Sequence, residues 1–153
     1  MNVTVVDLPT VQGVGRRHIG PYNLVGPAFD AVGAWCTSQG YCEDGMRIFG
    51  FSWDDPARVP ADELRYDIVF TMSRRVDPGP DNSWMEVEGG TYAMFLHRGP
   101  YSELPGAFAR MLTEWLPTTN FQLRDGPCFE EYFVDVDHND PSTWRVLIGI
   151  PIR

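Results

Sequence analysis

Two stretches of this chain carry the same pattern about eighty residues apart: His18-Ile-Gly-Pro-Tyr22 and His97-Arg-Gly-Pro-Tyr101. Each is followed by an Ala-Phe pair and then by a tryptophan, and further on each copy has an Asp-Gly pair that opens a strand-like run. Because several parts recur in the same order, the sequence predicts a fused duplication. Each copy is a supersecondary unit with an apolar face to cover, so the two copies are expected to meet and to form a cleft where they do.

The repeats set the expected domain organisation. The first is expected over about residues 1–75 and the second over about residues 84–153, joined by the linker RRVDPGPDNS. A length of 153 residues with 43% hydrophobic residues suits one domain with a sizeable core. We therefore expect residues 1–153 to form a single domain.

Charge and cysteine content limit the function classes. The net charge of −9 argues against direct binding of nucleic acid, which needs a basic face, and favours cationic partners. Three cysteines without CxxC spacing suggest neither a disulfide framework nor a zinc site. The N-terminus resembles no export signal, and VLIGIPI, the longest apolar run, is too short to span a membrane. The expected location is the cytoplasm.

The first repeat is predicted to contain two strands, a helix and two more strands. Strands are expected over 3–8 and 12–18. Asn23 is expected to cap a helix that Gly40 ends, and alternation then predicts strands over 46–53 and 64–72.

The second repeat follows the same plan. Strands over 85–88 and 91–97 are predicted to form a hairpin across Gly89-Gly90. Ser102 is expected to cap a helix that ends before Pro117, and two strands over 129–134 and 144–152 follow. The predicted fold class is α+β: tandem βαββ-type units with pseudo-twofold symmetry, in which an antiparallel sheet has both helices on one face and a central groove on the other.

The run Cys128-Phe-Glu-Glu-Tyr-Phe133 holds the main candidate site. Alternation places Glu130 and Tyr132 on one side of the strand and the two phenylalanines on the other. If the phenylalanines face the helices, Glu130 faces the groove, where Phe49, Phe51 and Trp53 of the matching strand would join it. A desolvated carboxylate among aromatic rings favours a cationic ligand.

The series GPY, EVEGGTYAMF, LRYDIVFTM and PCFEEY, in this order along essentially the whole chain, resembles the GyrI-like small-molecule-binding proteins. That family includes DNA gyrase inhibitory proteins and the effector-binding domains of AraC-type and MerR-type multidrug regulators. The resemblance implies tandem βαββ-type units around a groove, with a central glutamate that meets cationic or polyaromatic ligands. By motif position this is Glu130, with Tyr132 beside it. Glu131 departs from the family pattern, which usually has an apolar residue there.

Each candidate residue also has an ordinary structural interpretation. Glu130 could form a salt bridge with Arg65 or Arg145 at a strand edge. The aromatic candidates, Tyr132, Phe49, Phe51 and Trp53, could be sheet packing. Asp67, within the apolar run LRYDIVF, could face the groove or hold a neighbouring arginine, and the second is favoured.

No metal or cofactor is predicted. His18 and His97 occupy equivalent corners, but neither has further ligands at suitable spacing. In DVDHND, Asp140 stands where a calcium loop needs glycine, and GVGRRHIG lacks the spacing of a dinucleotide fingerprint.

Three functions follow from these observations. The leading hypothesis is a stand-alone protein that binds an amphipathic, cationic or aromatic small molecule in a groove between its halves through Glu130, Tyr132, Phe49, Phe51, Trp53 and Asp67. The second, suggested by the resemblance, is hydrolysis of cyclopropane-bearing DNA-alkylating natural products, with Glu130 and Tyr132 as catalytic residues. The third is inhibition of DNA gyrase by protein contact through the acidic loops DDPARVPADE and DVDHND.

Overall fold

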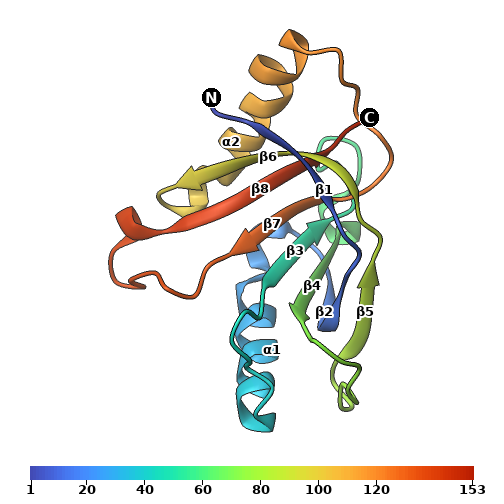
Figure 1. Cartoon of the computed structure of the whole chain (residues 1–153), viewed down its shortest axis with the longest axis vertical. Helices are drawn as coiled ribbons and strands as arrows, with labels where there is room; N and C mark the ends of the chain where they lie inside the picture. Colours follow the sequence, from blue (N-terminus) through green and yellow to red (C-terminus); the bar gives the residue numbers. More distant parts are fainter. The chain divides into compact units, whose positions relative to one another are not determined.

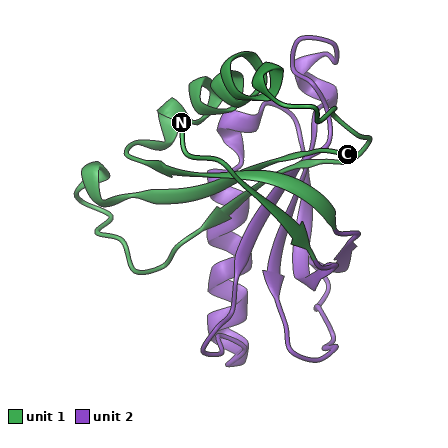
Figure 2. Ribbon diagram, turned by 45° about the horizontal axis from the view of Figure 1, so that its top comes forward, with its two compact units in different colours: residues 1–8, 90–153 green, residues 9–89 purple.

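The computed structural model describes all residues 1–153, and the chain divides into two compact units (Figure 2). Unit 1 comprises residues 1–8 and 90–153, and unit 2 comprises residues 9–89. These bounds differ from a simple division between the sequence repeats. The first strand of each repeat belongs to the unit that contains the rest of the other repeat.

Unit 1 contains four antiparallel strands in the order β1 (Thr4–Leu8), β6 (Gly90–Arg98), β8 (Arg145–Pro151) and β7 (Cys128–Tyr132) (Figure 1). Helix α2 (Leu104–Arg110) continues through a π-helical turn, η4 (Met111–Trp115), and a 3-10 turn, η5 (Leu116–Thr118). Two other 3-10 turns are η3 (Tyr101–Glu103) and η6 (Pro141–Thr143). The helix side of the strands forms a core with the helix, made of Ala93, Leu104, Ala107, Met111, Val146, Ile148, Ile150 and Ile152.

Unit 2 repeats the arrangement with the strand order β3 (Ile48–Ser52), β4 (Arg65–Thr71), β2 (Val11–Ile19) and β5 (Ser83–Val87). Helix α1 (Gly26–Gln39) ends at Gly40, which takes the left-handed conformation with φ 74° that glycine favours. Two 3-10 turns, η1 (Tyr22–Leu24) and η2 (Ala61–Glu63), lie in the connections. The helix packs on a core of Val14, Val25, Val32, Cys36, Tyr66, Ile68, Phe70 and Met72.

The starts of both helices differ from the prediction. Neither Asn23 nor Ser102 caps a helix; each lies inside a 3-10 turn that precedes it. In these turns the carbonyl groups of Pro21 and Pro100 accept the N–H groups three residues later. The repeated Gly-Pro-Tyr motif therefore makes a turn, and the α-helix begins only after it.

The predicted hairpin across Gly89-Gly90 is wrong. β5 pairs with β2, whereas β6 pairs with β1 and β8. The two glycines therefore link strands that belong to different units. A glycine pair signals that the backbone can turn, but it does not determine which strand the next segment joins.

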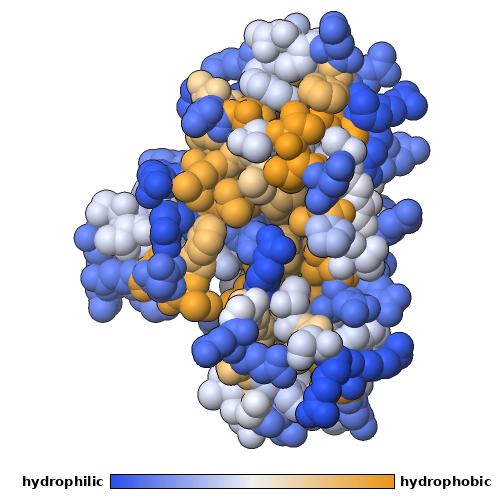
Figure 3. All heavy atoms as spheres, in the orientation of Figure 1, coloured by the Kyte–Doolittle hydropathy of each residue, from blue (hydrophilic) through white to orange (hydrophobic).

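The predicted fold class, α+β with two helices and antiparallel strands, is confirmed. Neither helix combines the length and apolar character that crossing a bilayer requires. Figure 3 shows hydrophobic residues gathered over the part of unit 1 that contains β1 and α2. The exposed apolar residues of unit 1 include Met1, Val5 and Leu112.

Candidate functional site

Strand β7 places Glu130 and Tyr132 on the side of unit 1 that carries α2. Glu130 is directly opposite Ile148, and Tyr132 is opposite Val146. Opposed residues in an antiparallel pair project to the same face, and both partners belong to the core beneath α2. Contrary to the prediction, Glu130 does not face away from the helix. The predicted pairing of Glu130 with Tyr132 on one face is correct, but that face is the helix-bearing one.

The two side chains interact directly. The Tyr132 hydroxyl donates a hydrogen bond to the Glu130 carboxylate, and both residues are partly exposed. The arginines that offered an alternative explanation bind other acids, because Arg65 pairs with Asp54 at 2.8 Å and Arg145 with Asp135 at 2.6 Å.

Three aromatic rings extend from this carboxylate. The Tyr101 ring meets the Tyr132 ring edge to face at 5.3 Å between centroids, and lies 4.4 Å from the Trp144 ring. We call Tyr132, Tyr101 and Trp144 the aromatic row. All three are partly exposed. Burial raises the pKa of the Tyr101 phenol, so this ring stays uncharged at neutral pH.

Tyr101 and Trp144 were not predicted as site residues. Tyr101 belongs to the second Gly-Pro-Tyr motif, whose turn also holds His97, since the His97 Nε2 atom lies 3.2 Å from the Pro100 carbonyl oxygen. His18 makes the same contact with Pro21 at 3.0 Å. The duplicated motif therefore explains both histidines as corner residues. It was the sequence signal that could have identified Tyr101 as a ring held at a fixed corner.

Unit 2 lacks the acid. The strand registers make Gly50 the counterpart of Glu130, because Gly50 is opposite Ile68 as Glu130 is opposite Ile148. A Cβ atom on Gly50 would lie 1.7 Å from the hydroxyl oxygen of Tyr66, which fills this place. The corresponding residue in unit 1 is the smaller Val146, so only unit 1 has room for a carboxylate there.

Phe49 and Phe51 lie on the face of unit 2 that points away from α1. They are opposite Val69 and Asp67, whereas the core beneath α1 uses the alternate residues Ile68 and Phe70. The two rings stack at 5.5 Å, and neither has exposed surface. In this structure they are interior residues with no surface to present to a ligand.

Asp67 holds an arginine, the interpretation favoured by the sequence. Its carboxylate accepts two hydrogen bonds from Arg17, at 2.8 and 2.9 Å, and a third from the indole of Trp53 at 2.8 Å. The ion pair raises the pKa of Arg17, and the Asp67 side chain is only 4% exposed. The Asp67 carboxylate thus already binds the Trp53 indole and the Arg17 guanidinium. We call these three residues a structural clamp.

The second glutamate of the pair, Glu131, lies on the face of β7 away from α2, with Phe129. It is opposite Leu147 and is 7% exposed. Phe129 fills the space above Gly149, where a Cβ atom would lie 2.1 Å from its ring, and the Tyr92 ring meets it at 5.0 Å. This face of unit 1 is therefore also packed, and the partly exposed acid of β7 is Glu130.

The fold and the sequence together identify the class of protein. The sequence profile of the GyrI-like small molecule binding domain matches residues 1–153, so the chain belongs to this family. A protein named DNA gyrase inhibitor, from Erwinia billingiae, is 26% identical over 156 residues, covering 99% of this chain and 97% of that protein.

Solved structures show the same fold. The C-terminal domain of EcmrR has a TM-score of 0.79 at 15% identity, covering 99% of this chain and 97% of that one. A hydrolase from Listeria innocua has a TM-score of 0.67 at 16% identity, covering 99% and 91%. SAV2435, solved bound to tetraphenylphosphonium, has a TM-score of 0.63 at 13% identity, covering 100% and 94%.

Proposed function

We propose that this protein binds an amphipathic organic cation with aromatic character through Glu130 and the aromatic row. The single observation that supports this most is the placement of a partly exposed carboxylate beside three partly exposed rings on one unit. The membership of the chain in a small-molecule-binding family agrees with it.

The chemistry of the group favours a cation over a neutral ligand. The Glu130 carboxylate accepts the hydrogen bond of the Tyr132 hydroxyl, so it offers a ligand acceptor oxygens and an acidic group. Aromatic faces carry partial negative charge and attract a cation by about 0.5–2 kcal/mol each, most strongly where water is displaced. Acid and rings therefore favour the same charge, and the rings add apolar contact area.

The tetraphenylphosphonium in the SAV2435 structure suggests a probe. Tetraphenylphosphonium is a bulky cation that cannot donate a hydrogen bond, so its affinity would report charge and apolar contact. Triphenylphosphine oxide has similar rings and no net charge. Comparing the two by calorimetry separates the contribution of Glu130 from that of the aromatic row.

We expect Glu130→Gln to weaken tetraphenylphosphonium binding about tenfold and to leave triphenylphosphine oxide nearly unchanged. Tyr101→Ala should weaken both ligands, since it removes contact area. The matched control is Glu86→Gln, which neutralises an exposed acid on β5 of unit 2. Equal affinity of wild type and Glu130→Gln for the cation would refute the assigned role.

The hydrogen bond between Tyr132 and Glu130 favours hydrolysis as a second candidate. The carboxylate can take a proton from water, and a phenol can donate one to the atom at which a strained ring opens, so that the elements of water are added across the broken bond. The neighbour from Listeria innocua is named a hydrolase. Ring-opened product from a cyclopropane-bearing alkylating compound, lost in Glu130→Gln and reduced in Tyr132→Phe, would support the enzyme. Tight binding without product in the wild type would reject it.

A further inference from the structure

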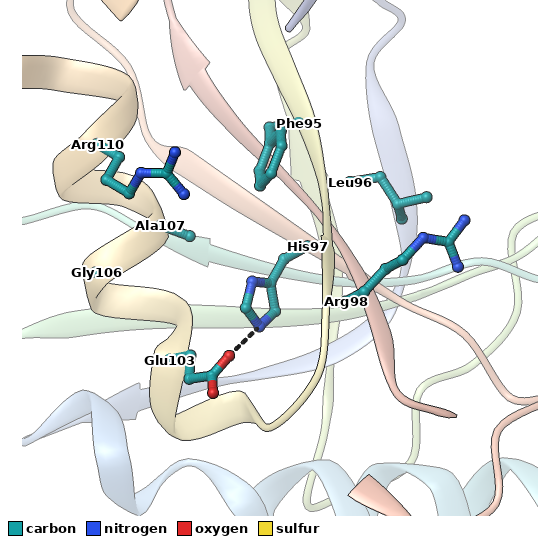
Figure 4. Close-up of a pocket in the computed structure, with 8 residues that line it drawn as sticks. All are labelled: Phe95, Leu96, His97, Arg98, Glu103, Gly106, Ala107 and Arg110. Carbon is teal, nitrogen blue, oxygen red and sulfur yellow. Dashed lines mark ion pairs between the residues drawn. The ribbon is translucent and has the colours of Figure 1, made fainter. Parts of the chain in front are cut away.

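A shallow depression in unit 1 lies between the last residues of β6 and helix α2 (Figure 4). Residues 95–98 of β6 line one side, and Glu103, Gly106, Ala107 and Arg110 line the other. In Figure 4, Phe95 and His97 point toward α2, whereas Leu96 and Arg98 point to the opposite side of the strand. A single depression meets both faces of a strand only along its edge. The depression therefore follows the outer edge of β6.

This edge is open because β1 covers only part of β6. The first residue of β1, Thr4, is opposite Met94, and the pairing runs from there toward Gly90. On its other side β6 pairs with β8 along its length, as far as Arg98. Residues 95–98 thus have a strand neighbour on one side, and the side toward the depression has none.

The hydrogen bonds with β8 show which backbone groups point outward. Gly99 donates its N–H to the Trp144 carbonyl at 2.9 Å, and the Thr91 carbonyl accepts the N–H of Ile152 at 3.0 Å. Antiparallel partners alternate, so the odd-numbered residues of β6 face β8 and the even-numbered residues face the outer edge. The N–H and C=O groups of residues 96 and 98 are therefore directed into the depression, as in a strand that awaits a partner.

The surroundings favour an acidic partner. Arg98 is exposed on one face of the strand. Arg110, whose side chain is 53% exposed and which also binds the exposed Glu114 at 3.2 Å, leans from α2 toward Phe95 on the other (Figure 4). The one acid of the lining, Glu103, faces the His97 Nε2 atom at 3.7 Å. A strand beside β6 would project alternate side chains toward these two arginines. Gly106 leaves room, since a Cβ atom there would meet nothing within 4 Å.

We propose that the outer edge of β6 at Leu96 and Arg98 is a docking site for an extended, acidic segment of a partner protein. The segment pairs with β6 through its backbone, as an added strand, and its carboxylates approach Arg98 and Arg110. A second copy of this chain fits less well, because pairing of two such edges about a twofold axis brings the arginines of one copy to those of the other. The docking site does not depend on the proposed small-molecule function.

The test uses the full chain and the capped peptide Val-Glu-Glu-Val-Glu, whose two adjacent glutamates project to opposite faces of a strand, observed by amide NMR and hydrogen exchange. We expect saturating peptide to shift the Leu96 and Arg98 amides and to slow their exchange. The same peptide with N-methyl groups on two adjacent residues cannot pair along either edge, so its binding should be lost. Arg98→Ala should weaken binding of the unmodified peptide about tenfold.

Two proline variants give a matched pair. Leu96→Pro removes an outward N–H that β8 does not use, and edge strands tolerate such a proline. Val5→Pro removes an outward N–H from β1 instead, on the other exposed edge. We expect the peptide to bind Val5→Pro normally and Leu96→Pro not at all. If Leu96→Pro fails to fold, two measurements still test the docking site. These are the affinity of Arg98→Ala for the unmodified peptide and the affinity of the wild type for the N-methylated peptide.

Four results would overturn the proposal. Equal binding of the N-methylated peptide, or of glutarate, would mean that the edge attracts carboxylates without pairing. Loss of binding in Val5→Pro but not in Leu96→Pro would move the site to β1. Self-association that Leu96→Pro abolishes would make the edge an interface between copies. Contacts between Asn2 and Leu96 in solution would mean that the chain's own N-terminus closes it.

Discussion

At the residue scale, Gly50 and Glu130 show how the two repeats diverged. They hold equivalent strand positions, but the Tyr66 hydroxyl occupies the space beside Gly50. We expect Gly50→Ala to lower the free energy of unfolding by about 1–3 kcal/mol, because the methyl group overpacks a buried ring. Urea denaturation monitored by tryptophan fluorescence measures this. Gly106→Ala is the control, since its methyl group meets open space on a helix and should stabilise slightly.

Asp67 provides a second prediction at this scale. It is nearly buried and accepts three hydrogen bonds. We therefore expect Asp67→Asn to lower the free energy of unfolding by about 2 kcal/mol. This value is below that of a fully buried ion pair, because the Arg17 side chain is 44% exposed. The control is Asp55→Asn, which removes the exposed pair with Arg58 at 3.7 Å and should change stability little. Similar destabilisation by both substitutions would contradict the clamp assigned to Asp67.

Cys36 makes a prediction about pH. Burial raises the pKa of its thiol from 9.0 to about 11, so the folded protein holds this proton more tightly than the unfolded chain does. The resulting stability is complete below pH 9 and is lost as the pH rises from about 9 to 11. Denaturation midpoints across this range should fall more for wild type than for Cys36→Ala. At pH 8, iodoacetamide should label exposed Cys42 and spare Cys36 until the chain unfolds.

The sequence identified Glu130 and Tyr132 as neighbours because alternation is a local property of a strand. It could not tell which face carries the helix. Phe129 suggested a helix-facing side, but that ring is 1% exposed on the opposite face, beside Tyr92. The buried residues of β7 lie on the face away from α2, and those on the face toward α2 are partly exposed, so the apolar side of the alternation did not mark the helix side. Phe49 and Phe51 do lie on the face away from the helix, as predicted, but alternation could not reveal that this face is packed and leaves neither ring exposed.

At the scale of elements, β1 links the N-terminus to the C-terminal half of the chain, because it forms the edge strand of unit 1 beside β6. The register directs the N–H of Val6 toward β6 and that of Val5 outward. Val6→Pro should therefore destabilise unit 1 by about 3 kcal/mol, whereas Val5→Pro should have a small effect. Hydrogen exchange of the β6 amides reports the difference. Equal protection in the two variants would show that the register is different in solution.

All eight strands and both helices lie close to the predicted ranges, since periodicity and turn residues act over a few positions. The partners of β5 and β6 were not predictable in the same way. Gly89-Gly90 is compatible with a tight hairpin, and nothing local reveals that β5 pairs with a strand more than sixty residues earlier. Strand pairing is decided by long-range packing, which sequence patterns do not record.

At the scale of the whole molecule, the net charge of −9 bears on partners. The relative named DNA gyrase inhibitor raises the question whether this chain also acts on gyrase. If its acidic loops meet a basic surface, the purified protein should reduce gyrase supercoiling, and the effect should weaken as salt rises from about 50 to 200 mM. Asp55→Asn combined with Asp62→Asn should reduce the effect. Unchanged supercoiling with the protein in excess would end the hypothesis.

The reciprocal placement of β1 and β5 has a consequence for synthesis. A ribosome releases β1 first, but its hydrogen-bonding partner begins at Gly90. Unit 1 thus stays incomplete until most of the polypeptide has emerged, and the N-terminal segment waits as an unpaired strand that a chaperone can hold. Unit 2, by contrast, is continuous over residues 9–89 and can close earlier. Expressing the second repeat alone would leave the β1-binding edge of β6 exposed. A synthetic peptide of residues 1–8 should bind this edge and restore the missing strand.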